Sequence, residues 1–188
     1  CRYARKKKLI VIADVKRGDI GSTAEGYAKA FLGKVDLFGK EAVSFGADAM
    51  TISPYFGFDG IKPFIDECKK HGKGIFILVK TSNKSSGELQ DRAVTDAFEG
   101  KPPLKLYEVL AHLVASWGSS EIGRSGYSSI GATVGATYPK EAAVLRKLMP
   151  HSFFLVPGYG AQGASAKDVK PCFNPDGYGA LINSSRDI

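Results

Sequence analysis

The sequence lacks the patterns that mark membrane, repeat and low-complexity proteins. No apolar run approaches the roughly 18 residues that suggest a membrane-spanning helix, and no internal repeat is present. The basic start, Cys1 to Lys8, leads into a short apolar stretch that turns charged at Asp14, so we expect no signal peptide there. With 188 residues, 44% hydrophobic and 24% charged, the chain resembles an ordinary globular protein with one substantial core.

Cysteine and histidine are scarce. The cysteines, Cys1, Cys68 and Cys172, are odd in number and scattered, without the paired spacing of a zinc or redox site. We therefore expect a reducing, cytoplasmic location. None of the three histidines has a partner four residues on, so the sequence predicts neither a metal site nor a histidine-based triad.

The charge is unbalanced, with 26 Lys and Arg against 19 Asp and Glu, a net +7. Such an excess suits nucleic acid, an acidic membrane surface or a phosphorylated small substrate. The densest basic cluster lies within Arg2 to Lys8, at the end of a predicted helix, where cations suit the helix dipole and solvent. No nucleic-acid motif accompanies it, so we expect neither a nucleic-acid partner nor a membrane.

Short apolar runs alternate with segments of helical spacing, which is typical of βα units around a parallel sheet. A barrel and a doubly wound sheet both fit this order. Predicted strands are Leu9 to Lys16, Ala49 to Pro54, Gly74 to Lys80, Ser129 to Gly135, Phe153 to Pro157 and Gly179 to Asn183. Predicted helices are Thr23 to Leu32, Lys34 to Phe45, Asp59 to His71, Leu104 to Trp117 and Pro139 to Leu148.

The longer loops follow the strands, at Arg17 to Ser22, Thr81 to Pro103 and Gly158 to Ser165. Because sites in such folds gather at the carboxyl ends of the strands, the chemistry is expected in these loops. Ser82 to Gly100 has no strong period and is interpreted as a mobile surface excursion or lid.

The most informative segment begins at Asp14 and ends at Thr23. Asp14 and Lys16 are two residues apart at the end of an apolar strand, so their side chains leave the same face. If that face is interior, the two charges must pair. Asp19 offers a second carboxylate to the same area or to a neighbouring subunit. Carboxylates around a lysine keep its ammonium charged, which suits a proton donor to a developing carbanion, although ordinary charges at a strand end also fit this spacing.

Asp14-Val-Lys-Arg-Gly-Asp19-Ile resembles the DxKxxDI signature of orotidine 5′-phosphate decarboxylases, with the greater likeness to the bacterial subgroup with longer loops. Further motifs follow in the family's order. They are Ser53-Pro-Tyr-Phe-Gly57, Val79-Lys-Thr-Ser-Asn83, Gly131-Ala-Thr-Val-Gly-Ala-Thr137, Val156-Pro-Gly-Tyr-Gly-Ala-Gln162-Gly and Asn183-Ser-Ser-Arg186.

The resemblance implies decarboxylation of orotidine 5′-phosphate to UMP without metal or cofactor. Lys16 would protonate C6 of the pyrimidine after carbon dioxide leaves, with Asp14 as its electrostatic partner. In the family's homodimer, Asp19, Ile20 and Thr23 would reach the partner's site, Asp19 completing the charged array and Thr23 touching the ribose.

Four further positions would bind substrate by the same resemblance. Ser82 would hydrogen-bond the pyrimidine, and Pro157 would lie beside the base and ribose. Gln162 and Arg186 would hold the phosphate. Independently of the family, barrels often bind phosphate with the loops after strands seven and eight, and arginine suits bidentate phosphate contacts.

The resemblance also implies an α/β (β/α)8 TIM barrel of which this chain, residues 1–188, represents strands 3 to 8 as a single incomplete domain. The family's first two βα units and final helix have no counterpart here. Another active-site lysine of the family belongs to the second strand, and a ribose-contacting aspartate to the first. Because an open arc would expose sheet edges, we expect a longer polypeptide or a second chain to supply these strands.

Two alternatives stay open. One is a sugar-phosphate decarboxylase or hexulose-phosphate synthase of the same barrel superfamily, whose members are similar in DxKxxD but use magnesium. The Ser82 and Pro157 to Gln162 loops argue against it. The other is a catalytically incompetent fragment that keeps a nucleotide-binding pocket without turnover.

Overall fold

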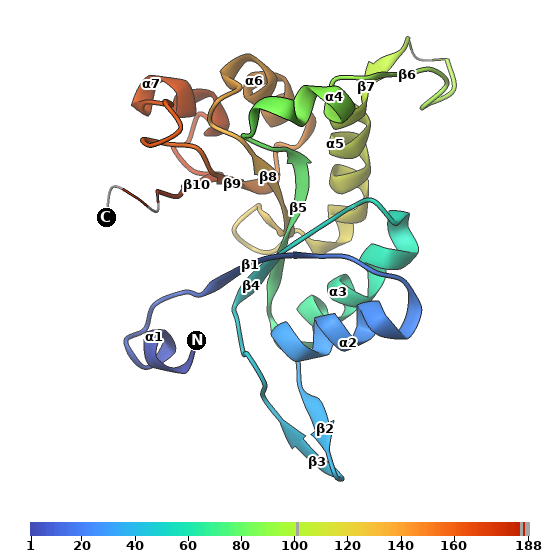
Figure 1. The fold of residues 1–188 in the computed structure, drawn as a ribbon, viewed down its shortest axis with the longest axis vertical. Helices are drawn as coiled ribbons and strands as arrows, with labels where there is room; N and C mark the ends of the chain where they lie inside the picture. Colours follow the sequence, from blue (N-terminus) through green and yellow to red (C-terminus); the bar gives the residue numbers. More distant parts are fainter. Residues whose placement is uncertain (101, 185, 187–188) are drawn as a thin grey trace. The chain divides into compact units, whose positions relative to one another are not determined.

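The computed structural model describes residues 1–100, 102–184 and 186, and the chain divides into two compact units, Cys1–Ile77 and Leu78–Ile188. Strand β5 (Gly74–Lys80) runs from the first unit into the second. Each unit is described by itself (Figure 1).

The first unit is built on parallel strands. Strand β4 (Ala49–Ile52) pairs in parallel with β1 (Ile12–Arg17) on one side and with β5 on the other. All four residues of β4 are buried, as a strand covered on both faces requires. Helix α1 (Arg2–Lys6) precedes β1, and helices α2 (Gly21–Phe31) and α3 (Gly57–His71) pack against each other.

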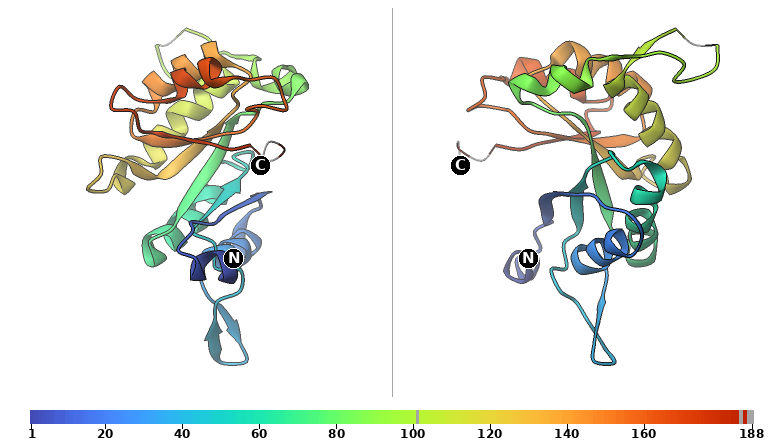
Figure 2. Two further views of the ribbon diagram at one scale, coloured as in Figure 1. Left: turned by 90° about the vertical axis from the view of Figure 1, so that its left-hand side faces the viewer. Right: turned by 45° about the vertical axis from the view of Figure 1, so that its right-hand side comes forward.

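The predicted helix at Lys34 to Phe45 is wrong. This segment is an antiparallel hairpin of β2 (Val35–Leu37) and β3 (Lys40–Ala42), which projects away from α2 and α3 in both views of Figure 2. Phe38 and Gly39 between the strands have φ of 55° and 79°, the left-handed values of a type I′ turn that matches strand twist. The turn residue Gly39 therefore outweighs the helical spacing of the apolar residues.

The second unit continues from the end of β5. Its parallel strands β8 (Ser128–Val134), β9 (Ser152–Val156) and β10 (Ala180–Ile182) follow β5 in that order across the sheet. Its helices are α4 (Gly87–Gln90), α5 (Leu106–Trp117), α6 (Pro139–Leu148) and α7 (Ala166–Val169), with 3₁₀ turns at Lys84–Ser86, Ser119–Glu121 and Lys170–Cys172.

The six predicted strands and four of the five predicted helices are confirmed, most with shifts of a few residues at their ends. The bounds of β5 and α6 match the prediction, because a continuous apolar strand and a helix with proline in its first turn are strong local signals. No helix of the described residues is long and apolar enough to cross a membrane.

The segment Ser82 to Gly100, interpreted from the sequence as a mobile surface excursion or lid, contains short regular elements. After the 3₁₀ turn and α4, strand β6 (Ala93–Val94) pairs in antiparallel fashion with β7 (Leu104–Lys105). Side chains from the end of β5 hold this segment, which a local pattern cannot show.

Each unit has its own apolar core. In the first, the buried apolar side chains come from α2, α3, β4 and the first half of β5. In the second, α5 and α6 supply apolar side chains beside β8 and β9. The fully buried large apolar side chains include Met50, Ile52, Ile61, Phe64, Ile75 and Ile77 in the first unit and Ile130, Leu145, Met149 and Phe154 in the second.

Candidate active site

Asp14 and Lys16 are bonded to each other at the end of β1. Lys16 Nζ donates to Asp14 Oδ1 at 2.6 Å. The same carboxylate oxygen accepts the hydroxyl of Thr51 at 2.9 Å, and that hydroxyl accepts the backbone N–H of Lys16 at 2.9 Å. Thr51, fully buried on β4, thus fixes both the carboxylate and the backbone of the lysine. These bonds form a closed ring.

The backbone of Lys16 is itself unusual. Its φ is 48°, in the left-handed region that residues with a Cβ avoid. The pairing of β1 with β4 shifts register between Ala13 and Arg17, so the lysine lies in a bulge that re-aims its side chain. Strain of this kind, of the order of 1–3 kcal/mol, is concentrated at functional sites.

The pair is more exposed than an interior position would be. The side chains of Lys16 and Asp14 are 52% and 61% exposed, and exposed ion pairs stabilise a fold by only about 0–1 kcal/mol. The contact therefore orients the two side chains more than it holds the unit together.

Asp19 is held apart from this pair. Its Oδ1 accepts the N–H of Ile20 at 2.8 Å, immediately before α2 begins. Among the described residues, no hydrogen bond or ion pair joins Asp19 to Lys16 or Asp14. Ile20, which precedes the first residue of α2, and Thr23 in its first turn are exposed, whereas Asp19 is half-buried.

In the second unit, Ser82 and Gln162 meet at Gly158, just after β9. A Cβ added at Gly158 would lie 3.1 Å from Ser82 Cβ, 3.4 Å from Thr137 Cγ2 and 3.5 Å from Gln162 Oε1. Thr137 also donates its hydroxyl to the carbonyl of Ser82 at 3.0 Å. The loops after β5, β8 and β9 therefore converge on a position where only glycine leaves room.

A pocket of about 220 Å³ opens beside this point. Gln162, Thr137 and Asp168 line it with three small loop residues and Pro139, the first residue of α6. Pro157 is half-buried, and its carbonyl accepts the N–H of Ala136 at 2.8 Å. Arg186 is exposed beyond β10.

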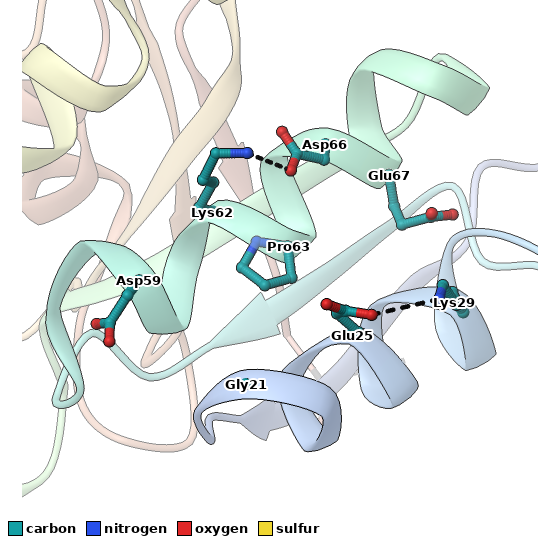
Figure 3. Close-up of a pocket in the computed structure, with 8 residues that line it drawn as sticks. All are labelled: Gly21, Glu25, Lys29, Asp59, Lys62, Pro63, Asp66 and Glu67. Atoms are coloured by element: carbon teal, nitrogen blue, oxygen red, sulfur yellow. Dashed lines mark hydrogen bonds and ion pairs between the residues drawn. The ribbon is translucent and has the colours of Figure 1, made fainter.

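A larger pocket of about 410 Å³ lies between α2 and α3 (Figure 3). Its walls carry two ion pairs, each within one helix: Glu25 with Lys29 and Lys62 with Asp66. None of the predicted site residues lines it. Paired charges of this type are those of a solvated helix surface.

The three histidines have structural neighbours. His71 Nε2 lies 3.2 Å from Glu67 Oε2, one turn earlier on α3. The His112 ring meets the edge of Phe98, and His151 Nδ1 lies 2.9 Å from the carbonyl of Gly126.

Sequence reasoning missed Thr51, Thr137 and Gly158. Thr51 and Thr137 lie within or just after strands that it identified, but no pattern along the chain says which neighbouring strand a hydroxyl meets. Gly158 had a usable signal, since a glycine directly after a buried strand often marks a close approach.

Parallel βα units with polar side chains at the carboxyl ends of their strands define an α/β protein, with the site where barrels and doubly wound sheets both place it. Within that class, the chain belongs to the orotidine 5′-phosphate decarboxylase / HUMPS family, whose sequence profile matches residues 1–188.

Curated relatives match the whole chain but are longer. The orotidine 5′-phosphate decarboxylase of Caldicellulosiruptor bescii is 49% identical over 188 residues, which are 100% of this chain and 59% of that protein. The enzyme of the same name from Rhodopirellula baltica is 48% identical over 186 residues, 99% of this chain and 58% of that protein. The chain thus spans about 59% of the length of such relatives.

Solved structures agree on the fold. Leishmania donovani UMP synthase superposes with a TM-score of 0.74 at 39% identity, over 95% of this chain and 34% of that one. Leishmania donovani OMP decarboxylase gives 0.70 at 35% identity, over 95% and 59%. The chain accordingly represents part of the family's TIM barrel.

Proposed function

We propose that this chain carries catalytic residues of an orotidine 5′-phosphate decarboxylase, which forms UMP. The observation that supports it most is the Asp14–Lys16 pair, held by Thr51 at a strained strand end in a chain of this family. The similarity to named enzymes also supports the proposal, since the orotidine 5′-phosphate decarboxylase of Caldicellulosiruptor bescii is 49% identical to this chain.

The proposed decarboxylation depends mainly on the charge and the position of the side chains around the substrate. The bond from C6 to the carboxylate breaks, carbon dioxide leaves, and the electron pair stays on C6. Lys16 Nζ, charged and aimed by Asp14, stabilises that carbanion and then delivers its proton to C6. Asp14 lies beside the departing carboxylate, where like charges favour its loss. The lysine becomes neutral and is reprotonated by solvent.

Substrate binding falls to the second unit in this proposal. Ser82 hydrogen-bonds the pyrimidine and Pro157 borders base and ribose, while Gln162 and Arg186 grip the phosphate. Binding energy from the phosphate is used to hold the reacting carboxylate in place. The convergence of Ser82 and Gln162 at Gly158 supports a shared pocket for base and phosphate.

The direct test is decarboxylation of orotidine 5′-phosphate by the complete protein that carries this chain. We expect turnover in the wild type and a loss of at least about a hundredfold in Lys16→Ala, the scale of a lost general acid. Lys29→Ala, a control on an exposed surface pair, retains activity. Turnover at the wild-type rate in Lys16→Ala would show that Lys16 is not the proton donor.

A nucleotide-binding fragment without turnover is the second candidate, favoured by the 59% coverage of the relatives. Titration of the 188-residue chain with UMP beside the turnover assay separates the two. Tight UMP binding without decarboxylation by this chain supports the second candidate, and turnover by it excludes that candidate.

A homodimer is part of the proposal. Ile20, Tyr55 and Phe58 expose large apolar side chains, at 56%, 83% and 48%, in the unit that holds Asp19, and exposed apolar patches are typical of interfaces. If Asp19 completes the partner's site, mixing inactive Asp19→Ala and Lys16→Ala proteins restores about a quarter of wild-type activity, because half of the dimers gain one intact site. No recovery in re-equilibrated dimers contradicts the shared site.

A metal-dependent sugar-phosphate enzyme is the remaining alternative within the family. Decarboxylase activity that survives chelator supports our proposal, and activity abolished by chelator and restored by magnesium favours the alternative. The cytoplasmic location and the single incomplete barrel domain stay predictions.

A further inference from the structure

Lys80, the last residue of β5, has a completely buried ammonium. Its side chain has 0% exposure, and Nζ contacts Asp91 Oδ1 at 2.8 Å. The rings of Tyr138 and Tyr107 lie 4.3 Å and 5.6 Å from Nζ. A charge so far from water is kept in a fold only when it is paired and surrounded in this way.

The partners of Lys80 belong to a segment that leaves β5 and returns to it. Asp91 directly follows α4, and Gln90, the last residue of α4, bonds Thr81 twice. Gln90 Oε1 accepts the N–H of Thr81 at 3.0 Å, and Gln90 Nε2 donates to the Thr81 hydroxyl at 2.8 Å. Residues 80 and 81 are thus bonded to residues 90 and 91, so that residues 82–89 form a loop whose two ends are held together.

Tyr138 also holds this loop, through hydrogen bonds of its hydroxyl. Its ring faces Lys80, while its hydroxyl donates to the carbonyl of Asn83 at 3.0 Å and accepts the hydroxyl of Ser86 at 3.2 Å. Ser86 is buried. One buried ammonium therefore connects the strand end, the ring of Tyr138 and the far end of the loop.

Ser82 is the first residue of this pinned loop. Its backbone is packed against Gly135, where an added Cβ would lie 2.7 Å from Ser82 Cα, and its carbonyl accepts the Thr137 hydroxyl. The position of the serine thus depends on where the loop leaves β5, which the Lys80–Asp91 pair fixes.

We propose that Lys80 and Asp91 are positioning residues that hold the loop of residues 82–89 in its binding-competent arrangement and so set Ser82 for the pyrimidine of the substrate. The proposal rests on the function proposed above. A competent state populated only in a fraction of molecules weakens apparent affinity by that fraction without changing the bound complex. The pair therefore acts on KM rather than on kcat.

The test compares KM and kcat for orotidine 5′-phosphate in wild type, Lys80→Met and Asp91→Asn of the complete protein. We expect KM to rise at least about tenfold in Lys80→Met, with kcat within about twofold, if the competent loop becomes a minor state. Asp91→Asn shifts KM in the same direction and carries the test should Lys80→Met fail to fold. Lys105→Met is the matched control, because Lys105 Nζ also lies 5.6 Å from the Tyr107 ring but is exposed.

A double-mutant cycle with Ser82→Ala separates positioning from general damage. If Lys80 acts through Ser82, Lys80→Met adds less than about twofold to KM once the serine hydroxyl is gone. Full additivity, or an unchanged KM in both single variants, overturns the positioning role while the decarboxylase function stands. A wild type without turnover overturns both.

Hydrogen exchange gives a reading that does not depend on turnover. In Lys80→Met, amides of residues 83–89 should exchange at least about tenfold faster than in wild type, while those of α6 stay protected. Equal protection of the loop contradicts the proposal.

Discussion

The guanidinium carbon of Arg146 lies 3.6 Å from the centre of the Phe154 ring, stacked in the interior of the second unit. Its nitrogens donate to the carbonyls of Cys172, Met149, Ser152 and Gly179 at 2.8 to 3.0 Å. Burial lowers the pKa of Arg146 to about 10, so it is still charged at neutral pH. One cation thus ties the end of α6 to the starts of β9 and β10.

We predict that Arg146→Met destabilises the fold by at least about 3 kcal/mol, because each buried carbonyl left without a donor costs roughly 1–3 kcal/mol. Arg146→Lys recovers part of the loss, since an ammonium keeps the charge but not the planar fork. Urea unfolding measures both. Lys147→Met, one residue on and exposed, should stay within about 0.5 kcal/mol of wild type. Equal stability of Arg146→Met and wild type would show that the carbonyls find other donors.

A second prediction concerns the backbone of Lys16, whose φ of 48° favours glycine. Glycine normally costs about 0.5–1 kcal/mol relative to alanine within a strand. At position 16 the order reverses, and Lys16→Gly should unfold at higher urea than Lys16→Ala. Both variants lose the bond to Asp14, so the difference isolates the backbone.

The matched control is Val15, whose φ is not in the left-handed region. There the alanine variant is the more stable one. Alanine more stable than glycine at both positions would mean that Lys16 is unstrained.

These residues also show what the sequence could predict. The spacing of Asp14 and Lys16 predicts that they share a face, because they are two residues apart on a strand, and they do pair. The pairing itself is expected only for an interior face, and both side chains are more than half exposed. The left-handed conformation of Lys16 was not predictable, since it depends on the register shift against β4. Thr51, which closes the ring of bonds, is brought there by a neighbouring strand.

The same distinction explains Lys80 and Arg146. A lysine ending a strand normally extends toward solvent, and an arginine in the last turn of a helix normally meets the dipole or water. Their burial depends on Tyr138, Asp91 and Phe154, which lie far away along the chain. The β2–β3 hairpin is the opposite case, because its turn signal, Gly39, is local in the sequence, and the helix prediction gave it less weight than the spacing of the apolar residues.

The third prediction is a pH dependence. Burial raises the pKa of Tyr107 to about 12, and the negative charges of Glu108, Glu141 and Asp91 act in the same direction. In the unfolded chain the pKa is about 10, so the folded state holds the phenol proton more tightly. Its contribution to stability is complete below about pH 10 and is lost as pH rises toward 12.

Tyr107→Phe removes this dependence. Between pH 9.5 and 11.5, the free energy of unfolding should therefore fall less steeply in Tyr107→Phe than in wild type, by up to about 1.4 kcal/mol per pH unit. Tyr178→Phe is the control for the loss of a phenol hydroxyl, because that side chain is 67% exposed. Parallel curves for wild type and Tyr107→Phe would contradict the raised pKa.

The last prediction uses the close approach of Gly135 to Ser82. A Cβ at Gly135 would lie 2.7 Å from Ser82 Cα and 2.8 Å from Ser82 N, distances at which the backbone itself must move. Gly135→Ala should raise KM for orotidine 5′-phosphate about tenfold. A tenfold change corresponds to about 1.4 kcal/mol of binding free energy, which is the size of the loss expected when one hydrogen-bonding group is displaced. Adding Ser82→Gly cannot restore affinity, because the collision is with backbone atoms.

Gly26→Ala is the control for this substitution. Gly26 lies within α2, has nothing within 4 Å of an added Cβ, and should gain about 0.5–1 kcal/mol of stability from the better helix former. If Gly135→Ala binds the substrate as tightly as wild type does, the backbone just after β5 must move at little cost in free energy. In that case the packing against Gly135 would not fix Ser82, and the serine would be held by the Thr137 hydroxyl and by the loop contacts that Lys80 makes.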